Sequence, residues 1–294
     1  MGKGVKDSAC RAECEDLAED NAAKIVCRPF LKWVGGKSQL LPELLPRFPK
    51  NVKRYFEPFI GGGAVLFAYQ PKLATVVDVN QELIGAYTVV RDDVESLIKD
   101  LRRHVHDEAY YYDIRNADRS PSFAKWSAAR KAARLIYLNK TCYNGLYRVN
   151  SQGFFNTPFG SYVNPTIADA DNLRACSRVL QGVEIKHGDF DQIEEQIGPD
   201  DFVYFDPPYV PLTATAYFTS YSKNGFDRDM QQSLFELCCR LDRRGIRFML
   251  SNSAAEFVKT LYKKFRVDIV MAARAVNSKG DKRGRIEEVL VTNY

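Results

Sequence analysis

Residues 56–63 of the chain are FEPFIGGG, and this stretch decides the fold. Its aromatic start is typical of a strand end, and the helix-like run Ala64–Tyr69 follows the three glycines. Glycines at a switch from strand to helix let the backbone approach a nucleotide-like ligand, because no Cβ stands in the way. Asp78 lies 21 residues after Glu57, at the end of the next predicted strand, where an acid can accept hydrogen bonds from ribose hydroxyls. The stretch favours a cofactor that contains a nucleoside; the alternative is a tight turn followed by a capping aspartate.

The residues after the glycines argue against two other nucleotide sites. A dinucleotide fingerprint needs a small residue three positions after Gly63, where Leu66 stands with Phe67 beside it. No lysine follows at the position that a phosphate-binding P-loop requires. The cofactor is therefore expected to be neither a dinucleotide nor a nucleoside triphosphate held in a P-loop.

Short apolar runs alternate with segments of helical periodicity along much of the remaining chain. Buried strands are predicted at Val76–Asp78, Gly182–Lys186, Phe202–Phe205 and Arg247–Leu250, and a helix at Met230–Arg240. Strands that alternate with helices predict a mostly parallel sheet covered on both faces, which is a Rossmann-like α/β fold.

An insert interrupts this alternation. Helices are predicted at Asp93–His106 and Ser127–Asn139, and Thr141–Tyr162, rich in Tyr, Asn, Gly and Phe, predicts a hairpin. The expected divisions are an N-terminal extension at 1–28, a sheet domain at 29–82 and 181–294, and an inserted domain at 83–180.

The second informative stretch is Asp206-Pro207-Pro208-Tyr209, directly after the predicted strand Phe202–Phe205. Two prolines stiffen the turn and remove two N–H donors. A backbone carbonyl and the Asp206 carboxylate can then both accept hydrogen bonds from one exocyclic amino group, while Tyr209 stacks on the ring that bears it. Such an amine is a weak nucleophile, so holding its hydrogens and aligning it with an electrophilic methyl group would supply most of the catalysis.

Charge is unevenly distributed along the 294 residues, although the net charge is only +5. Residues 101–150 carry +6, residues 151–239 carry −8 and residues 240–285 carry +9. Two basic blocks around an acidic one suit a polyanionic partner such as nucleic acid. The alternative is that these lysines and arginines are solvated side chains on helix faces.

Composition excludes several other classes of protein. A hydrophobic content of 45% is that of an ordinary globular protein, and seven cysteines without regular spacing argue against a disulfide framework. The three histidines form no metal-ligand pattern, and no apolar run reaches the roughly 18 residues of a membrane span. We therefore expect no metal, no membrane association and a cytoplasmic location, since residues 1–28 also lack the pattern of a signal peptide or a mitochondrial leader.

Four motifs together resemble those of the Dam-type DNA adenine-N6 methyltransferases, which form the D12 class. They are FLKWVGGK at residues 30–37, EPFIGGG, YNGLYR at residues 143–148, and DPPY with its continuation PLTATA at residues 211–216. The resemblance extends from Arg28 to Leu290, in the motif order of the α group. It implies a sheet domain that binds S-adenosylmethionine (AdoMet) and an inserted domain, at 83–180, that recognises the target.

The resemblance also implies roles for individual residues. Those expected at the cofactor are Trp33, Lys37, Pro58, Phe59, Gly61, Gly63, Asp78, Asp189, Phe190 and Asp206. Those expected at the reacting amine are Asp206, Pro207, Pro208 and Tyr209, with the adenine flipped out of the duplex. For Trp33 and Phe190 the alternative is a core aromatic residue.

Duplex DNA is the partner that the resemblance implies. The residues expected to contact it are Tyr143, Asn144, Leu146, Arg148, Asn156, Pro158, Tyr162, Lys279 and Arg283. Arg148 is the candidate for a bidentate contact with guanine, and Tyr143 for a wedge in the base stack. Asn144 and Leu146 are expected to read nearby groups, and Asn156 and Pro158 to contact an outer base pair. Together these residues favour GATC. Ser161 stands where this family often has arginine, so one phosphate contact is in doubt. A restriction endonuclease is a further possible counterpart.

Two alternatives remain at this point. The first is a methyltransferase of another planar amine, either an RNA adenine or a protein glutamine amide, although glutamine methyltransferases usually have NPPY. The second is a DNA-binding relative without catalysis, against which the complete DPPY motif argues.

Overall fold

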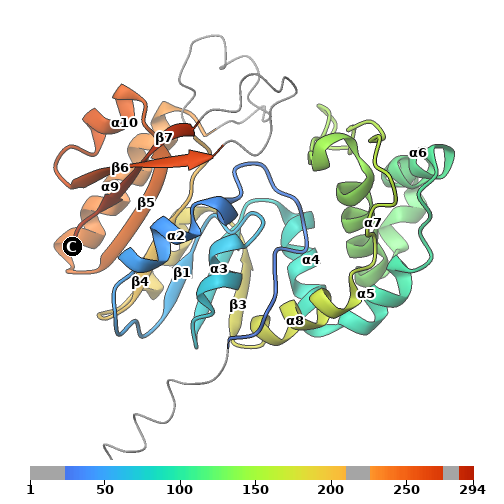
Figure 1. The fold of residues 1–294 in the computed structure, drawn as a ribbon, viewed down its shortest axis with the longest axis horizontal. Helices are drawn as coiled ribbons and strands as arrows, with labels where there is room; N and C mark the ends of the chain where they lie inside the picture. The colour runs from blue at the N-terminus through green and yellow to red at the C-terminus, as the bar shows by residue number, and fades with distance from the viewer. Residues whose placement is uncertain (1–23, 210–225, 274–284) are drawn as a thin grey trace, which may run out of the picture.

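The computed structural model describes residues 24–209, 226–273 and 285–294. Figure 1 shows a twisted sheet with helices against it and a further group of helices beyond one edge. The strands are β1 (Tyr55–Glu57), β2 (Ala74–Asp78), β3 (Val183–His187), β4 (Phe202–Phe205), β5 (Arg247–Ser253), β6 (Arg266–Ala273) and β7 (Arg285–Thr292). The helices are α2 (Leu41–Leu44), α3 (Ala64–Tyr69), α4 (Gln81–Asp92), α5 (Val94–Leu101), α6 (Glu108–Asn116), α7 (Ala128–Thr141), α8 (Ala170–Leu180), α9 (Arg228–Arg243) and α10 (Glu256–Leu261).

The strands of the described residues form one sheet in the order β3-β2-β1-β4-β5-β7-β6. The first five are parallel, whereas β7 runs antiparallel to both β5 and β6. The strand order reverses between β1 and β4, which pair directly, and in parallel α/β sheets ligands bind beyond the carboxyl ends of the strands at such a point. The α/β fold expected from the sequence is confirmed.

Alternate residues of each strand divide the interior into two cores. Tyr204 and Met249 face one core, whereas Val203 and Phe248 face the other, as the two-residue period of a strand requires. Helices α3, α4 and α8 cover the first core, and α9 and α10 cover the second. Because both faces are covered, the inner strands are continuously apolar, which is why they could be recognised in the sequence.

The helices between β2 and β3 lie beside the β3 edge of the sheet (Figure 1). Helix α4 packs on β2 and β3 and is contacted by α7 and α8, so it links the sheet to the insert. Helix α7 begins after Ser127, whose hydroxyl accepts the N–H of Arg130, and it is buried along most of its length. A third apolar cluster, formed by Tyr111, Tyr137, Leu138, Cys142 and Phe155, stabilises this region.

The predicted strands and helices lie where the structure has them, but their ends differ. All four predicted strands coincide with β2, β3, β4 and β5 to within a few residues, and Ser127–Asn139 corresponds to α7. The helix predicted at Asp93–His106 is α5, which already ends at Leu101. The N–H groups of Arg103 and His104 bond three residues back, to Asp100 and Leu101, because the chain tightens into a turn there.

The hairpin predicted at Thr141–Tyr162 is present as a doubled-back segment without regular strands. Antiparallel bridges join its two arms at Cys142–Phe159 and Val149–Phe155, and the Asn156 N–H donates to the Arg148 carbonyl between them. Asn144 and Gly145 both have positive φ, at 56° and 66°, so the segment begins with a tight turn instead of a strand.

Across residues 24–209, 226–273 and 285–294, every helix is too short or too polar to cross a lipid bilayer. The same residues contain no group of three or more His, Cys, Asp or Glu side chains arranged to hold a metal ion.

Candidate active site

A glycine turn at the carboxyl end of β1 forms the floor of the site. Gly61 and Gly63 have φ of +47° and +72°, a conformation that side chains disfavour. A Cβ on Gly61 would lie 2.9 Å from Cδ1 of Trp33, and one on Gly63 would overlap the hydroxyl of Tyr87. The backbone is therefore packed closely against both aromatic residues. Tyr87 also donates a hydrogen bond to the Gly61 carbonyl, at 3.0 Å, which holds the turn in place.

Asp78 ends β2 next to this turn. Its carboxylate accepts the N–H of Gly61 at 3.1 Å and that of Asn80 at 2.9 Å. Burial raises the pKa of Asp78, and the two backbone donors oppose that shift. The Gly188 N–H bonds the Asp78 carbonyl, which brings the loop after β3 to the same end of the sheet. The adjacent strand ends thus bring together the glycine turn and Asp78, as the sequence predicted.

Trp33 lies over the glycine turn. Its indole is half-buried and stacks on Tyr147, with the ring centroids 5.4 Å apart and the planes 26° from parallel. Phe30 and Leu31, just before it, are anchored in the first core. Trp33 therefore lies between the glycine turn and the insert, half-buried against the edge of the first core, and its role at the cofactor stays a prediction.

Lys37 is 5% exposed and contacts the DPPY segment. Its Nζ lies 2.7 Å from Oδ1 of Asp206, donates to the Gly35 carbonyl at 2.7 Å, and stands 4.5 Å from the ring centroid of Tyr209. A buried ammonium needs such partners, because an isolated one would cost several kcal/mol. The sequence predicted that Lys37 lies near the cofactor, but it gave no sign of the ion pair with Asp206.

Asp206 follows β4 at the reversal point of the sheet, and its side chain is 18% exposed. Oδ1 accepts from the Ser251 hydroxyl at 3.0 Å as well as from Lys37. Since Ser251 uses its proton on Asp206, Tyr204, 2.9 Å away, donates to Ser251. Burial raises the pKa of Asp206, and the charge of Lys37 opposes that shift. Both of these contacts are made by Oδ1, on one side of the carboxylate.

Tyr209 is held by a residue of β7, the strand that follows β5 in the sheet. Its hydroxyl donates to Oε2 of Glu288, on β7, at 2.5 Å. Burial raises the pKa of Tyr209 well above its ordinary value, so the phenol keeps its proton, and burial also raises the pKa of Glu288. Pro207 is buried, whereas Pro208 is exposed and its carbonyl accepts from Gln231 at 3.2 Å.

Phe59, Phe190 and Phe226, which lie near the glycine turn, belong to the second core. Phe190 is 3% exposed and stacks on Phe59, with centroids 5.5 Å apart, and Phe226 packs edge-on against both rings. Asp189 begins the 3-10 helix Phe190–Gln196, where its carboxylate accepts the Phe190 N–H at 2.7 Å. This packing favours the structural alternative for Phe190. Asp189 and Phe190 nevertheless line one shallow pocket together with Met230 and Glu236.

The residues expected to contact DNA lie on the doubled-back segment of the insert. Tyr143, Asn144 and Pro158 are exposed, and Leu146 is half-buried. Arg148 is fixed from behind, because its Nε donates to Oδ1 of Asn156 at 2.7 Å and its Nη2 to the Asn156 carbonyl at 3.3 Å.

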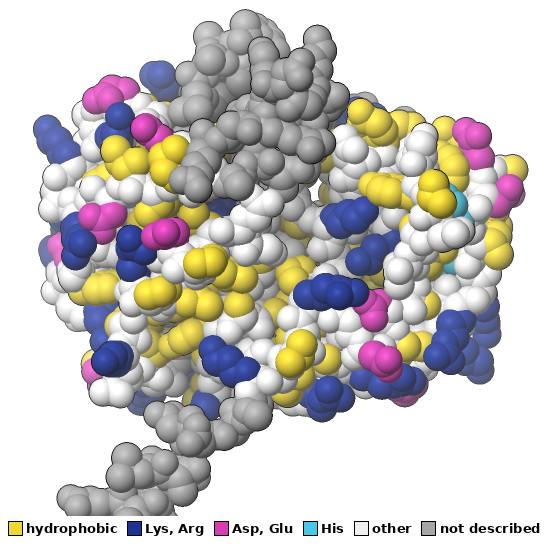
Figure 2. All heavy atoms as spheres, in the orientation of Figure 1, with side chains coloured by type: hydrophobic (Ala, Val, Ile, Leu, Met, Phe, Trp, Pro, Cys, Tyr) yellow, Lys and Arg dark blue, Asp and Glu magenta, His cyan; other side chains and the backbone are white. Residues whose placement is uncertain are grey.

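Basic side chains surround this segment. The Tyr162 ring lies 4.1 Å from Nζ of Lys32. Figure 2 shows Lys and Arg side chains gathered over α4 and α7 on this face. Lys279 and Arg283 lie outside the described residues.

Sequence reasoning missed the residues that support the site from behind. These are Ser251 on β5, Glu288 on β7, and Asn139 and Tyr147 in the insert. Glu288 is a half-buried acid that directly precedes the apolar run Val289–Val291, and the sequence carries no further sign of its role.

Comparison with known proteins identifies relatives over most of the chain. Residues 33–276 match the family described as D12 class N6 adenine-specific DNA methyltransferase. The Type II methyltransferase M1.LlaDCHI of Lactococcus lactis subsp. cremoris is 42% identical over 275 residues, which cover 92% of this chain and 97% of the relative. The Type II methyltransferase M.MjaIII of Methanocaldococcus jannaschii is 44% identical over 288 residues, 91% of this chain and 99% of the relative. The DNA adenine methylase of Escherichia coli K12 is 31% identical over 265 residues, 90% and 94% of the two chains.

Proposed function

The chain belongs to the D12 class of N6 adenine-specific DNA methyltransferases, and from that premise we propose that it transfers a methyl group from AdoMet to adenine N6 in duplex DNA at GATC. The observation that supports this best is Asp206 at the reversal point of the sheet, one strand away from the glycine turn after β1. A methyl donor held at one of these strand ends would lie next to an amine held at the other, and the amine could accept the methyl group.

The residues around the glycine turn fit AdoMet. Gly61 and Gly63 let the backbone pack directly against Trp33 and Tyr87, which fixes the turn beside Asp78. Asp78, with two backbone donors on its carboxylate, offers its remaining lone pairs to ribose hydroxyls. Trp33 would cover the ligand. Lys37 would join the chain at Gly35 to Asp206, because its ammonium contacts both. When bound, AdoMet supplies an electrophilic methyl group.

The DPPY segment would receive the amine. Lys37 and Ser251 occupy Oδ1 of Asp206, which leaves Oδ2 to accept one hydrogen of the adenine amine. The Pro208 carbonyl is used by Gln231, so we assign the second hydrogen to the carbonyl of Pro207. With both hydrogens held, the lone pair of N6 would face the methyl group that AdoMet supplies, and Oδ2 would accept the proton that N6 loses when the methyl group leaves the sulfur of AdoMet.

Adenine must leave the duplex before its N6 can reach Asp206. Lys37 stands over one face of the Tyr209 ring, so the flipped base would stack on the other face.

We assign recognition of the DNA sequence to the doubled-back segment that contains Arg148. Because Asn156 fixes its guanidinium, the outer nitrogens are presented for the O6 and N7 acceptors of guanine. Tyr143 and Asn144 would enter the space left by the flipped base, and Lys279 and Arg283 would contact phosphates. We also propose the division into a catalytic domain, 29–82 and 181–294, and a target-recognition domain, 83–180, with α4 and α8 packed between them.

The names of the first two relatives suggest a role in restriction and modification, and a restriction endonuclease counterpart is proposed on that basis.

Transfer of a labelled methyl group tests the proposal. A duplex with GATC should accept label, whereas one with a scrambled site, single-stranded RNA and a glutamine peptide should not. Asp206→Ala should abolish transfer while the variant still binds the duplex, and Asp171→Ala, at a fully exposed carboxylate, should change neither. Label transferred to RNA or peptide instead of DNA would overturn the proposed substrate. Label transferred equally to the scrambled duplex would overturn GATC.

A further inference from the structure

Two side chains of the insert, the buried Asn139 and the half-buried Tyr147, hold the segment that contains Trp33. Asn139, in the last turn of α7, is 0% exposed. Its Oδ1 accepts the Lys32 N–H at 2.8 Å, and its Nδ2 donates to the Lys32 carbonyl at 2.8 Å and to the Gly145 carbonyl at 3.0 Å. The amide therefore pairs with Lys32 as a neighbouring strand would, and it ties Lys32 to the turn at Gly145.

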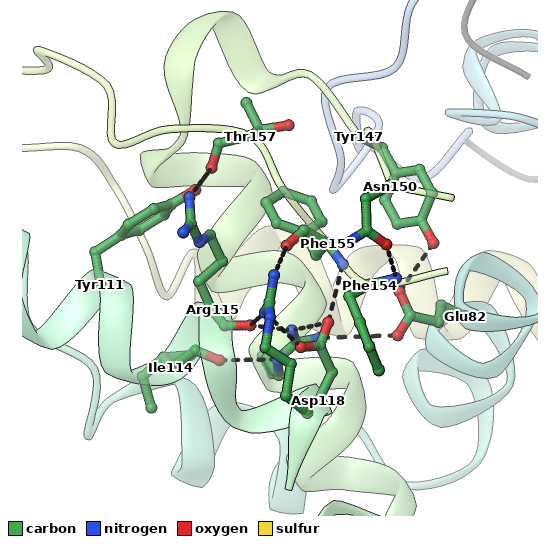
Figure 3. Close-up of polar contacts among 12 residues, drawn as sticks. Glu82, Tyr111, Ile114, Arg115, Asp118, Tyr147, Asn150, Phe154, Phe155 and Thr157 are labelled. Carbon is green, nitrogen blue, oxygen red and sulfur yellow. Dashed lines mark hydrogen bonds and ion pairs between the residues drawn. The ribbon is translucent and has the colours of Figure 1, made fainter. Parts of the chain in front are cut away.

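Tyr147 makes the second connection. Its ring stacks on Trp33 and meets Phe155 edge-on at 5.8 Å. Its hydroxyl donates to Oε2 of Glu82, in α4, at 3.0 Å, the contact drawn in Figure 3. Glu82 follows Asp78 by four residues, so Tyr147 contacts the surroundings of the cofactor site at two places, Trp33 and the start of α4.

The backbone around Tyr147 leaves little room for independent movement. Gly145 has φ of +66°, and a Cβ there would lie 2.6 Å from Cδ of Lys32. Tyr147 stands between Leu146 and Arg148, and Arg148 is hydrogen-bonded to Asn156 across the doubled-back segment. A rotation of the Trp33 indole would thus displace the ring of Tyr147, and with it the backbone next to Arg148.

We propose that Tyr147 is a positioning residue that links the cofactor site to the DNA-reading segment, with Asn139 fixing the backbone on both sides of the contact. The inference rests on the proposed function for the identity of the two ligands. Binding of the cofactor against Trp33 orients Tyr147 and so presets Arg148. By thermodynamic reciprocity, DNA bound at Arg148 strengthens cofactor binding by the same factor.

The test is a binding cycle with S-adenosylhomocysteine and a GATC duplex, measured by fluorescence anisotropy of the labelled duplex. For the unaltered protein we expect the cofactor product to tighten DNA binding about tenfold, within the usual range of such linkage. Tyr147→Leu should reduce that factor to near one, and Tyr147→Phe, which keeps the stack but loses Glu82, should give an intermediate value. Tyr112→Leu, at another half-buried tyrosine of the insert, should keep the full factor.

A second readout does not depend on the identity of the cofactor. The chain has two tryptophans, so Trp126→Phe leaves Trp33 as the sole indole fluorophore. Adding duplex DNA should shift Trp33 emission in this background, and the additional change Tyr147→Leu should remove the shift. An equal shift with and without Tyr147, or an unchanged linkage factor in Tyr147→Leu, would overturn the inference. Failure to bind S-adenosylhomocysteine or to prefer GATC would overturn the proposed function instead, and the emission measurement would then decide the inference.

Discussion

Replacing Lys37 with Met should move the acidic limb of the pH–activity profile to higher pH. In the proposed mechanism Asp206 must be ionised to accept the amine, so activity is expected to fall as pH falls through the pKa of Asp206. Burial raises that pKa and Lys37, 2.7 Å away, opposes the rise. Without the ammonium, burial still raises this pKa and less opposes it, so the carboxylate of the variant takes up its proton at a higher pH.

The size of the shift follows from the geometry. Unit charges about 4 Å apart in a medium of effective dielectric constant about 20 interact by about 4 kcal/mol, or about three pKa units. Lys37 is 5% exposed and Asp206 is 18% exposed, so solvent reaches only one side of the pair. Water that enters the space left by the ammonium recovers part of the loss, and we expect a shift of about one to two units. Ser251→Ala removes one neutral donor worth about 1 kcal/mol, so its shift should stay below about one unit.

Single-turnover methyl transfer to a GATC duplex, followed with labelled AdoMet at saturation, measures the shift without interference from cofactor affinity. Lys186→Met is the matched control, because Lys186 pairs with Glu184 on the surface. An acidic limb of Lys37→Met that coincides with that of the unaltered enzyme would refute the assignment of this limb to Asp206.

Variants at three further places test other parts of the structure. Tyr209→Phe and Glu288→Ala should each slow methyl transfer about tenfold, since either removes the hydrogen bond between these two side chains, worth about 1.5 kcal/mol. The double variant should be no slower than the slower single variant in the same kinetic assay. Arg134→Met should lower the free energy of unfolding in urea by about 3 to 5 kcal/mol, because Arg134 is buried and pairs with a carboxylate, whereas the exposed Arg130→Met should cost under about 1 kcal/mol. Gly63→Ala should lower stability by about 1–2 kcal/mol from backbone conformation alone, measured by the same unfolding, and calorimetry should show weakened S-adenosylhomocysteine binding.

The sequence placed the glycine turn, Asp78 and Asp206 at the ends of predicted strands, and the structure brings these ends together, while the roles of the residues stay predictions. A buried strand followed by an acid or by glycines is visible locally, so Asp78, Gly61 and Asp206 could be assigned to one edge of the sheet. The edge strand β6 was not predicted, because it alternates exposed and buried residues between charged neighbours.

The supporting residues could not be predicted in this way. Glu288 meets Tyr209 across 79 positions of sequence, and Asn139 meets Lys32 across 107. Such contacts depend on the order of strands and on the angle of α7, neither of which leaves a local pattern. Phe190 was ambiguous for another reason, since an aromatic residue after a strand suits either a core or a ligand pocket.

The stack of Trp33 on Tyr147 also bears on how enzymes of this kind acquire new target sites. The insert joins the sheet through α4 and α8, so an ancestral recombination could exchange it while leaving the strand ends intact. An exchanged insert would still have to bring an aromatic partner for the indole and an amide for the Lys32 backbone. These two contacts restrict which foreign inserts the sheet can accept, so diversification of target sequence is expected to conserve the residues that face the cofactor and to vary those that face the bases.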